Sequence, residues 1–168
     1  MFIQNIHIVE DDSFFAELII LKLKQHYPDV KLQHFLSGED LLAQDHGADL
    51  LILDYDLNDA TGEAKMTGLE LRKALQARGD QTATIFLTGM QDISDAVFMM
   101  ENHASDFIVK NRSSLDNLIT TIKDLEDIVE LAKEKTTITS TSNDHKTGWK
   151  LVAAALIVLL VIFAIFSS

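Results

Sequence analysis

Short apolar runs alternate with amphipathic segments along the first 134 residues. Five runs rich in Ile, Val, Leu and Phe have the length of strands: Phe2–Val9, Val30–Phe35, Leu50–Leu53, Ala83–Leu87 and Phe107–Val109. Helical spacing or capping signals mark the segments that follow them: Ser13–His26, Ser37–Gln44, Thr67–Arg78, Asp92–Asn102 and Ser113–Lys133. Regular alternation with short connections predicts an α/β fold, a doubly wound five-stranded parallel sheet with helices on both faces.

Local signals support several of these elements. Thr67 is followed three residues later by a glutamate, the spacing of a capping box, and Gly79 suits the end of the same helix. Asp12 or Ser13 is expected to cap the first helix. The run Leu50–Leu53 is apolar without alternation, which is typical of a central strand buried on both faces.

The last fifth of the chain has a different composition from the rest. Residues 135–148 are polar apart from Ile138 and predict a flexible Ser/Thr-rich linker. Leu151–Phe166 is an unbroken run of 16 apolar residues. A helix of this length rises about 24 Å, and Trp149 and Lys150 can extend it to the interfaces of a hydrocarbon core of roughly 30 Å. We therefore expect residues 1–134 to form one domain and residues 149–168 a transmembrane anchor.

The expected orientation follows from charge. Lys146 and Lys150 precede the apolar run and only Ser167 and Ser168 follow it, so the domain is expected on the cytoplasmic face of a bacterial inner membrane. The first 20 residues carry four acids and no basic start, unlike a signal peptide. The alternative is a helix buried in the domain's own core, which would need the polar linker to return it to a sheet already covered on both faces.

The composition of the chain argues against several classes of function. The chain has 168 residues with 26 acidic and 14 basic side chains, for a formal net charge of -12. Such a surface repels phosphate backbones, so nucleic acid is not an expected partner. The absence of cysteine excludes disulfides, thiolate metal sites and thiol catalysis.

Polar residues gather where the predicted strands end. Glu10 and Asp11 follow the first strand, while Asp54, Thr88 and Lys110 end the third, fourth and fifth. Taken singly, each has an ordinary explanation as a cap, a turn residue or a surface lysine. However, the carboxyl ends of parallel strands share one edge, where open α/β sheets bind their ligands. The joint pattern predicts a functional site.

The residue types indicate phosphoryl chemistry. Three carboxylates held together repel one another unless a cation neutralises them, and oxygen ligands without His or Cys suit Mg²⁺. A carboxylate such as Asp54 can then attack phosphorus and form an aspartyl phosphate. Lys110 and Thr88 would bind the phosphoryl oxygens, one as a charge and one as a hydroxyl donor.

From residue 1 to about 130 the sequence resembles the response-regulator receiver family of two-component signalling. The motifs are the acidic cluster in IVEDD, the aspartate in LLILDYD, the threonine in IFLTG and the lysine in DFIVK. The resemblance implies a flavodoxin-like fold and a Mg²⁺ cofactor. It also assigns roles to individual residues: Asp54 as phosphoacceptor, Glu10, Asp11 and Asp54 as metal ligands with the backbone carbonyl of Asp56, Lys110 at the phosphoryl group, and Thr88 and Phe107 as the switch pair.

The same resemblance implies partners. A histidine kinase or phosphotransfer protein would supply the phosphoryl group, and the protein would catalyse only its own phosphorylation and dephosphorylation. Phosphorylation would remodel the surface formed by residues 92–102, 107–109 and 113–133, which is also a possible homodimer interface. Because no output domain follows, we expect either that a separate downstream protein receives the signal or that the domain serves as a phosphate sink.

Two positions depart from the family pattern. Asn111 replaces a proline that usually follows the lysine, so we expect a trans peptide bond there. The loop after Asp54, residues 57–67, is also longer than usual. Asn58 takes a proline position, and Gly68 comes fourteen residues after the aspartate, as if six residues were inserted.

Two other functions remain open from sequence alone. Asp54 and Asp56 also resemble the Asp-x-Asp of haloacid-dehalogenase phosphatases, although in those enzymes this motif follows the first strand and the acidic pair comes late. The second alternative is a pseudo-receiver, an interaction module that no longer accepts phosphate, which the absent proline favours.

Overall fold

The computed structural model describes residues 3–44, 47–57, 66–89 and 106–140, with side chains as far as Leu131. The elements in chain order are β1 (Asn5–Val9), α1 (Ser13–His26), β2 (Lys31–Phe35), α2 (Gly38–Leu42), β3 (Leu50–Asp54), α3 (Gly68–Ala77), β4 (Ala83–Thr88), β5 (Asp106–Val109) and α5 (Ser114–Ser140). All five predicted strands are confirmed, with ends that shift by up to three residues. The predicted helix Asp92–Asn102 lies outside the described residues.

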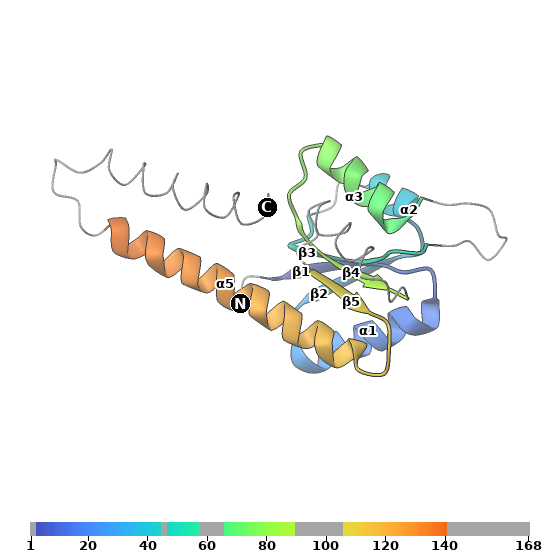
Figure 1. Cartoon of the computed structure of the whole chain (residues 1–168), viewed down its shortest axis with the longest axis horizontal. Coiled ribbons are helices and arrows are strands. Elements are labelled where there is room, and N and C mark those ends of the chain that lie inside the picture. The colour runs from blue at the N-terminus through green and yellow to red at the C-terminus, as the bar shows by residue number, and fades with distance from the viewer. Residues whose placement is uncertain (1–2, 45–46, 58–65, 90–105, 141–168) are drawn as a thin grey trace. The chain divides into compact units, whose positions relative to one another are not determined.

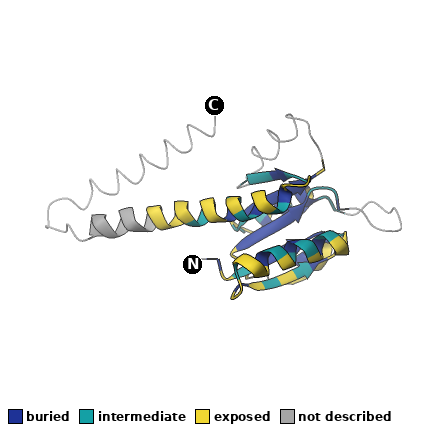
Figure 2. Cartoon of the chain, turned by 90° about the horizontal axis from the view of Figure 1, so that it is seen from below, coloured by how far each residue is buried: buried dark blue, intermediate teal, exposed yellow. Residues whose placement is uncertain are grey.

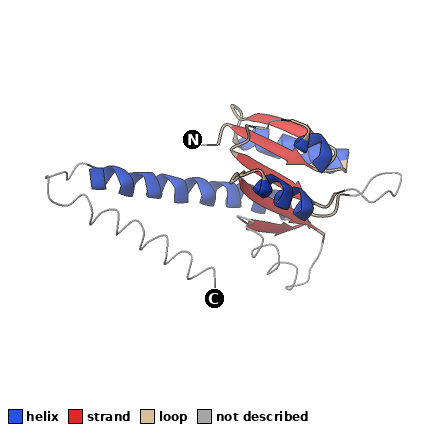
Figure 3. Ribbon diagram, turned by 90° about the horizontal axis from the view of Figure 1, so that it is seen from above, coloured by secondary structure: helices blue, strands red, loops and turns tan. Residues whose placement is uncertain are grey.

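The strands form one parallel sheet in the order β2-β1-β3-β4-β5 (Figures 1 and 3). Helices α2 and α3 cover one face, and α1 and the first half of α5 cover the other (Figure 1). This arrangement confirms the doubly wound α/β fold. Crossovers between parallel strands are right-handed in nearly all proteins, so a reversal of strand order moves the connecting helices to the opposite face.

The core has two layers, one on each side of the sheet. Every residue of β3 is buried, as its continuous apolar run predicts (Figure 2). Successive residues of a strand point to opposite faces. One layer, the α1/α5 cluster, contains Ile6, Ile8, Ile19, Leu23, Leu118 and Ile122. The other, the α2/α3 cluster, contains Val9, Leu41, Leu51, Leu53, Leu71 and Phe86.

The predicted caps of α1 and α3 are confirmed. Thr67 caps α3: its hydroxyl accepts a hydrogen bond from the Glu70 N–H at 3.2 Å, and Glu70 accepts one from the Thr67 N–H at 2.9 Å. Gly79 follows the last residues of the same helix with a φ of 84°, a conformation that glycine adopts without a steric penalty. At α1 the cap is Asp12, which accepts from two backbone N–H groups.

Helix α5 is longer than the sequence pattern predicts. It was expected to end at Lys133, but it continues to Ser140, so residues 135–140 are helical and are not the flexible linker expected there. Once a helix is formed, each added residue gains a backbone hydrogen bond, and Thr and Ser oppose this by only about 0.5 kcal/mol each relative to Ala. Residues 141–148 lie outside the described residues.

Contacts divide the chain into two compact units, residues 1–126 and 127–168, with the division inside α5. Among the described residues, no helix has both the length and the hydrophobicity that a membrane crossing requires. The expected span Leu151–Phe166 lies outside that part of the chain.

Candidate functional site

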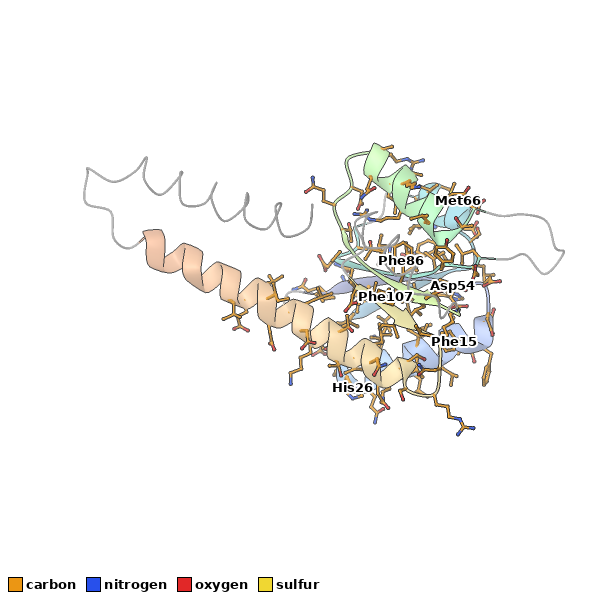
Figure 4. All side chains as sticks on the ribbon, in the orientation of Figure 1. Phe15, His26, Asp54, Met66, Phe86 and Phe107 are labelled. Atoms are coloured by element: carbon orange, nitrogen blue, oxygen red, sulfur yellow. The ribbon has the colours of Figure 1, made fainter. Side chains whose placement is uncertain are left out.

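Predicted site residues from three strand ends meet at the carboxyl edge of the sheet. The Nζ atom of Lys110, just after β5, lies 2.8 Å from Asp54 Oδ2 at the end of β3. It lies 2.9 Å from Oε2 of Glu10, just after β1. The pairing of β1 with β3 and of β3 with β4 holds these ends level with one another. Figure 4 labels Asp54 at this edge.

The Asp54 carboxylate has a partner on each of its two oxygens. Asp54 is 4% exposed. Its Oδ1 accepts a hydrogen bond from the backbone N–H of Asp56 at 3.3 Å, and its Oδ2 pairs with Lys110. The next residue, Tyr55, donates its N–H to the carbonyl of Leu87 on β4 at 2.8 Å, which continues the strand pairing beyond the site. The Asp54 side chain therefore has a defined orientation before any ligand arrives.

Glu10, Asp11 and Asp54 form a cluster with the geometry of a metal site. One oxygen from each lies within 4.8 Å of the other two. All donors are carboxylate oxygens, the ligand type that Mg²⁺ prefers. Asp56, expected to contribute its carbonyl, is half-buried two residues beyond Asp54. The donor set thus fits the predicted cation.

Among the described residues of the site, the charges do not balance. Three carboxylates face one ammonium there, and Glu10 is fully buried. Burial, followed by the charge of Asp54, raises the pKa of Glu10 to about 7, although Lys110 opposes the shift. Burial also raises the pKa of Asp54, against the effect of Lys110. Burial alone would lower the pKa of Lys110, but its hydrogen bonds with the two carboxylates raise it overall. A divalent cation would relieve this excess of negative charge.

The two predicted switch residues lie on neighbouring strands. Thr88 ends β4 and is 2% exposed, and its carbonyl accepts a hydrogen bond from the Lys110 N–H at 2.7 Å. Phe107 on β5 is paired in register with Phe86 on β4 (Figure 4). Its half-buried side chain packs against the α2/α3 cluster. The Thr88 backbone is thus hydrogen-bonded to Lys110, and Phe107 lies on the adjacent strand; their role as a switch stays a prediction.

Asn111 shapes the connection from β5 to α5. The Lys110–Asn111 peptide bond is trans, as expected, like the other peptide bonds of the described residues. The Asn111 side chain accepts a hydrogen bond from the Ser113 N–H at 2.7 Å, and its carbonyl accepts one from the Ser114 hydroxyl at 2.8 Å. Asparagine therefore organises the turn that proline would otherwise constrain.

Gly68, the first residue of α3, lies against the backbone of Asp54. A Cβ atom at Gly68 would lie 2.1 Å from the carbonyl oxygen of Asp54, so only glycine fits without a backbone shift. The Gly68 N–H donates to the Tyr55 carbonyl at 3.0 Å, and Met66 donates its N–H to Glu39 of α2 at 3.1 Å. Sequence reasoning assigned Gly68 only to a helix start. Residues 58–65, which contain most of the expected insertion, lie outside the described residues.

One further contact was not predicted. The Nζ atom of Lys110 lies 4.9 Å from the centroid of the Phe15 ring. Phe15 is in the first turn of α1, where an aromatic residue at helical spacing indicates core packing and nothing more. No local signal could have found this contact, because it joins residues from opposite ends of the domain.

Comparison with known proteins agrees with this geometry. Residues 6–123 match the response regulator receiver domain. The chain belongs to this family. It is therefore a signalling module of two-component systems rather than a catalytic enzyme, and the phosphatase alternative is wrong. Its described fold, with five parallel strands in the order 2-1-3-4-5, is the flavodoxin-like receiver fold.

Individual relatives cover the same region. The transcriptional regulatory protein TrcR of Mycobacterium tuberculosis is 28% identical over 120 residues, which are 70% of this chain and 43% of TrcR. A CheY-like receiver domain protein from Methanospirillum hungatei is 25% identical with a TM-score of 0.61, covering 79% of this chain and 98% of that one. The BeF3-activated receiver domain of DrrB is also 25% identical, with a TM-score of 0.61 and coverages of 74% and 98%. The chain spans less than half the length of the curated relatives it matches.

Proposed function

We propose that this receiver domain accepts a phosphoryl group on Asp54 from a histidine kinase or phosphotransfer protein. The observation that carries the proposal is the buried cluster in which one lysine pairs with two carboxylates, Lys110 with Asp54 and Glu10. A purely structural ion pair needs one carboxylate, whereas transfer of a phosphoryl group needs a nucleophile, a cation site and a counter-charge at one point.

The chemistry follows from these positions. An oxygen of Asp54 attacks phosphorus, the new O–P bond forms as the donor's P–N bond breaks, and the donor imidazole leaves. Lys110 offers its ammonium to the phosphoryl oxygens, and Thr88 offers its hydroxyl. Mg²⁺, when bound by Glu10, Asp11, Asp54 and the carbonyl of Asp56, would neutralise charge on the phosphoryl oxygens.

The direct test is labelling of the full chain in detergent with acetyl phosphate and Mg²⁺. Wild type is expected to take up phosphate, and Asp54→Asn is expected to abolish it. Asp29→Asn, at an exposed aspartate, is the matched control and should label normally. Asp11→Asn should require more Mg²⁺. Undiminished labelling of Asp54→Asn would remove the assignment, and a wild type that never labels would favour the pseudo-receiver.

Phosphorylation is proposed to act on partner proteins through side-chain movements of Thr88 and Phe107. A phosphoryl group that draws the Thr88 hydroxyl toward Asp54 would free space for the Phe107 ring, and the surface around β5 and α5 would change. Hydrogen exchange with and without beryllofluoride tests this. Unchanged exchange around both residues would count against the switch.

A second copy of the chain is a proposed partner alongside a separate downstream protein. Three apolar side chains of α5 are exposed: Ile128 at 62%, Val129 at 41% and Leu131 at 56% (Figure 2). The chain has no cysteine, so single-cysteine variants give an unambiguous crosslinking test. Val129→Cys should form an intermolecular disulfide on oxidation, and Asp127→Cys, placed away from Val129 around the helix, should not. Equal crosslinking of both variants would argue against this interface.

The apolar run Leu151–Phe166 is proposed to anchor the domain to the cytoplasmic face of a bacterial inner membrane. Its support is sequence alone: sixteen apolar residues preceded by Trp149 and two lysines. Fractionation of the full chain against a truncation ending at Lys146 is the test. The full chain should sediment with membranes and need detergent for release, and the truncation should not. A full chain that stays in solution without detergent would end this proposal.

A further inference from the structure

The Lys110 ammonium has an aromatic neighbour as well as its two carboxylates. Its Nζ atom lies 4.9 Å from the Phe15 ring centroid, while Asp54 and Glu10 approach it at 2.8 and 2.9 Å. A cation within about 6 Å of a ring centroid is attracted to the negative face of the ring. The Phe15 ring therefore bounds the ammonium on the side of α1.

Phe15 is held in place by contacts other than the one with Lys110. Its backbone N–H donates to the side chain of Asp12, the cap of α1, at 3.2 Å. Its half-buried side chain packs against the α1/α5 cluster. The neighbouring Phe14 differs: its side chain is 70% exposed. Two adjacent phenylalanines in one helical turn thus have different surroundings, and the ring that lies beside Lys110 is that of Phe15 (labelled in Figure 4).

A lysine needs such support at this position. Its ammonium ends a flexible four-carbon stem, and the Lys110 side chain is 24% exposed. Without a neighbour on the α1 side, the ammonium could turn toward water and away from Asp54. The ring cannot replace the carboxylates as a partner, because it carries no net charge. It can restrict the ammonium to the orientation that the carboxylates and an incoming phosphoryl group require.

We propose that Phe15 is a positioning residue whose ring holds the Lys110 ammonium over Asp54 and thereby sets the rate of phosphoryl transfer. This inference rests on the proposed function, because it concerns the rate of the same reaction. It assigns to α1 a part in the chemistry as well as in the core.

The test is the initial rate of Asp54 phosphorylation by acetyl phosphate and Mg²⁺ in the full chain. Phe15→Leu keeps an apolar side chain and removes the ring, so the rate should fall roughly 3- to 20-fold, the range expected for a partly desolvated cation–π contact. Phe15→Tyr should remain near wild type. Phe14→Leu, one residue away, should leave the rate unchanged. Phe15→Met is a second ring-free variant should Phe15→Leu fold poorly.

A series of fluorinated phenylalanines at position 15 separates positioning from packing. Successive fluorines keep the shape of the ring and progressively reverse its quadrupole, so the rate should fall stepwise toward that of Phe15→Leu. A rate that ignores fluorination would show that the ring acts by packing alone and would overturn the inference. So would a wild-type rate in Phe15→Leu, with the proposed function intact. A wild type that never labels would overturn both.

Discussion

Two groups of buried charges lie in this domain and are built in opposite ways. On the α3 side, Arg72 is 4% exposed and pairs with Asp80 at 3.3 Å. Asp80 also accepts hydrogen bonds from the N–H and hydroxyl of Thr82, at 2.7 and 3.2 Å. One positive charge faces one negative charge, and the carboxylate has further donors. At the carboxyl edge, by contrast, Lys110 faces both Glu10 and Asp54.

The difference separates a structural ion pair from a reactive one. Burial lowers the pKa of Arg72 and Asp80 opposes the shift, so the two charges of this pair compensate one another. The site instead has more carboxylates than ammonium groups. Burial and the repulsion between Glu10 and Asp54 raise the pKa of Glu10. A balanced buried pair is destabilised by losing either partner, whereas an unbalanced one is relieved by losing an acid or gaining a cation. The predictions below test this contrast.

The largest effect is expected at the balanced pair. Arg72→Met should lower the free energy of unfolding by about 3 kcal/mol, because it leaves Asp80 partly buried without its cation. Chemical denaturation measures the loss, and Arg112→Met at an exposed arginine is the control. Phosphorylation per folded molecule should not change. A loss no larger than that of the control would show that the pair is not structural.

The site should make the metal-free protein less stable as pH rises. The folded state holds a proton on Glu10 up to a pKa of about 7, whereas the unfolded state releases it near 4.5. Protonation therefore favours folding: the contribution is complete below pH 4.5 and disappears as pH rises through 7. Its size is up to about 3 kcal/mol.

Denaturation of wild type and Glu10→Gln between pH 4.5 and 8, with chelator present, isolates this contribution. The difference in unfolding free energy should shift in favour of the variant as pH rises. If the two proteins keep a constant difference across this range, Glu10 does not titrate there.

Mg²⁺ should offset the destabilisation that the ionised carboxylates of the site cause, and it should leave the Arg72–Asp80 pair unaffected. At pH 7.5, a concentration ten times the dissociation constant should raise the free energy of unfolding by about 1.4 kcal/mol. The same increment is expected in Arg72→Met and a smaller one in Asp11→Asn. Thermal melts across a Mg²⁺ titration measure it, with Ca²⁺ as a comparison. An equal increment in Asp11→Asn would place the cation elsewhere.

The smallest effect has the opposite sign to the first. In metal-free protein near neutral pH, Asp54→Asn should stabilise the fold by about 1 kcal/mol, because it removes one of two carboxylates that compete for Lys110. The same substitution is expected to abolish labelling, so stability and activity should change in opposite directions. If Asp54→Asn destabilised the fold, the cluster around Lys110 would behave like the Arg72–Asp80 pair, and the contrast between them would fail.

The alternation of apolar runs was sufficient to predict the strands, the α/β class and the helix caps. These features are local: the Thr67 capping box and the glycine at position 79 are determined by residues three or four apart. The ends of parallel strands must share an edge, so Asp54 and Lys110 could be brought together from sequence pattern alone. The end of α5 could not be predicted in this way, because Thr and Ser residues continue a helix only when a stable helix precedes them.

Tertiary structure decided what lies around those strand ends. The contact of Phe15 with Lys110, and the approach of Gly68 to the Asp54 carbonyl, join segments distant in the sequence and depend on how α1 and α3 pack on the sheet. The raised pKa of Glu10 likewise follows from full burial beside Asp54. The sequence determines which charged residues are present and at the end of which strand each one lies. The distances between those charges and the dielectric constant around them are set only when the chain has folded.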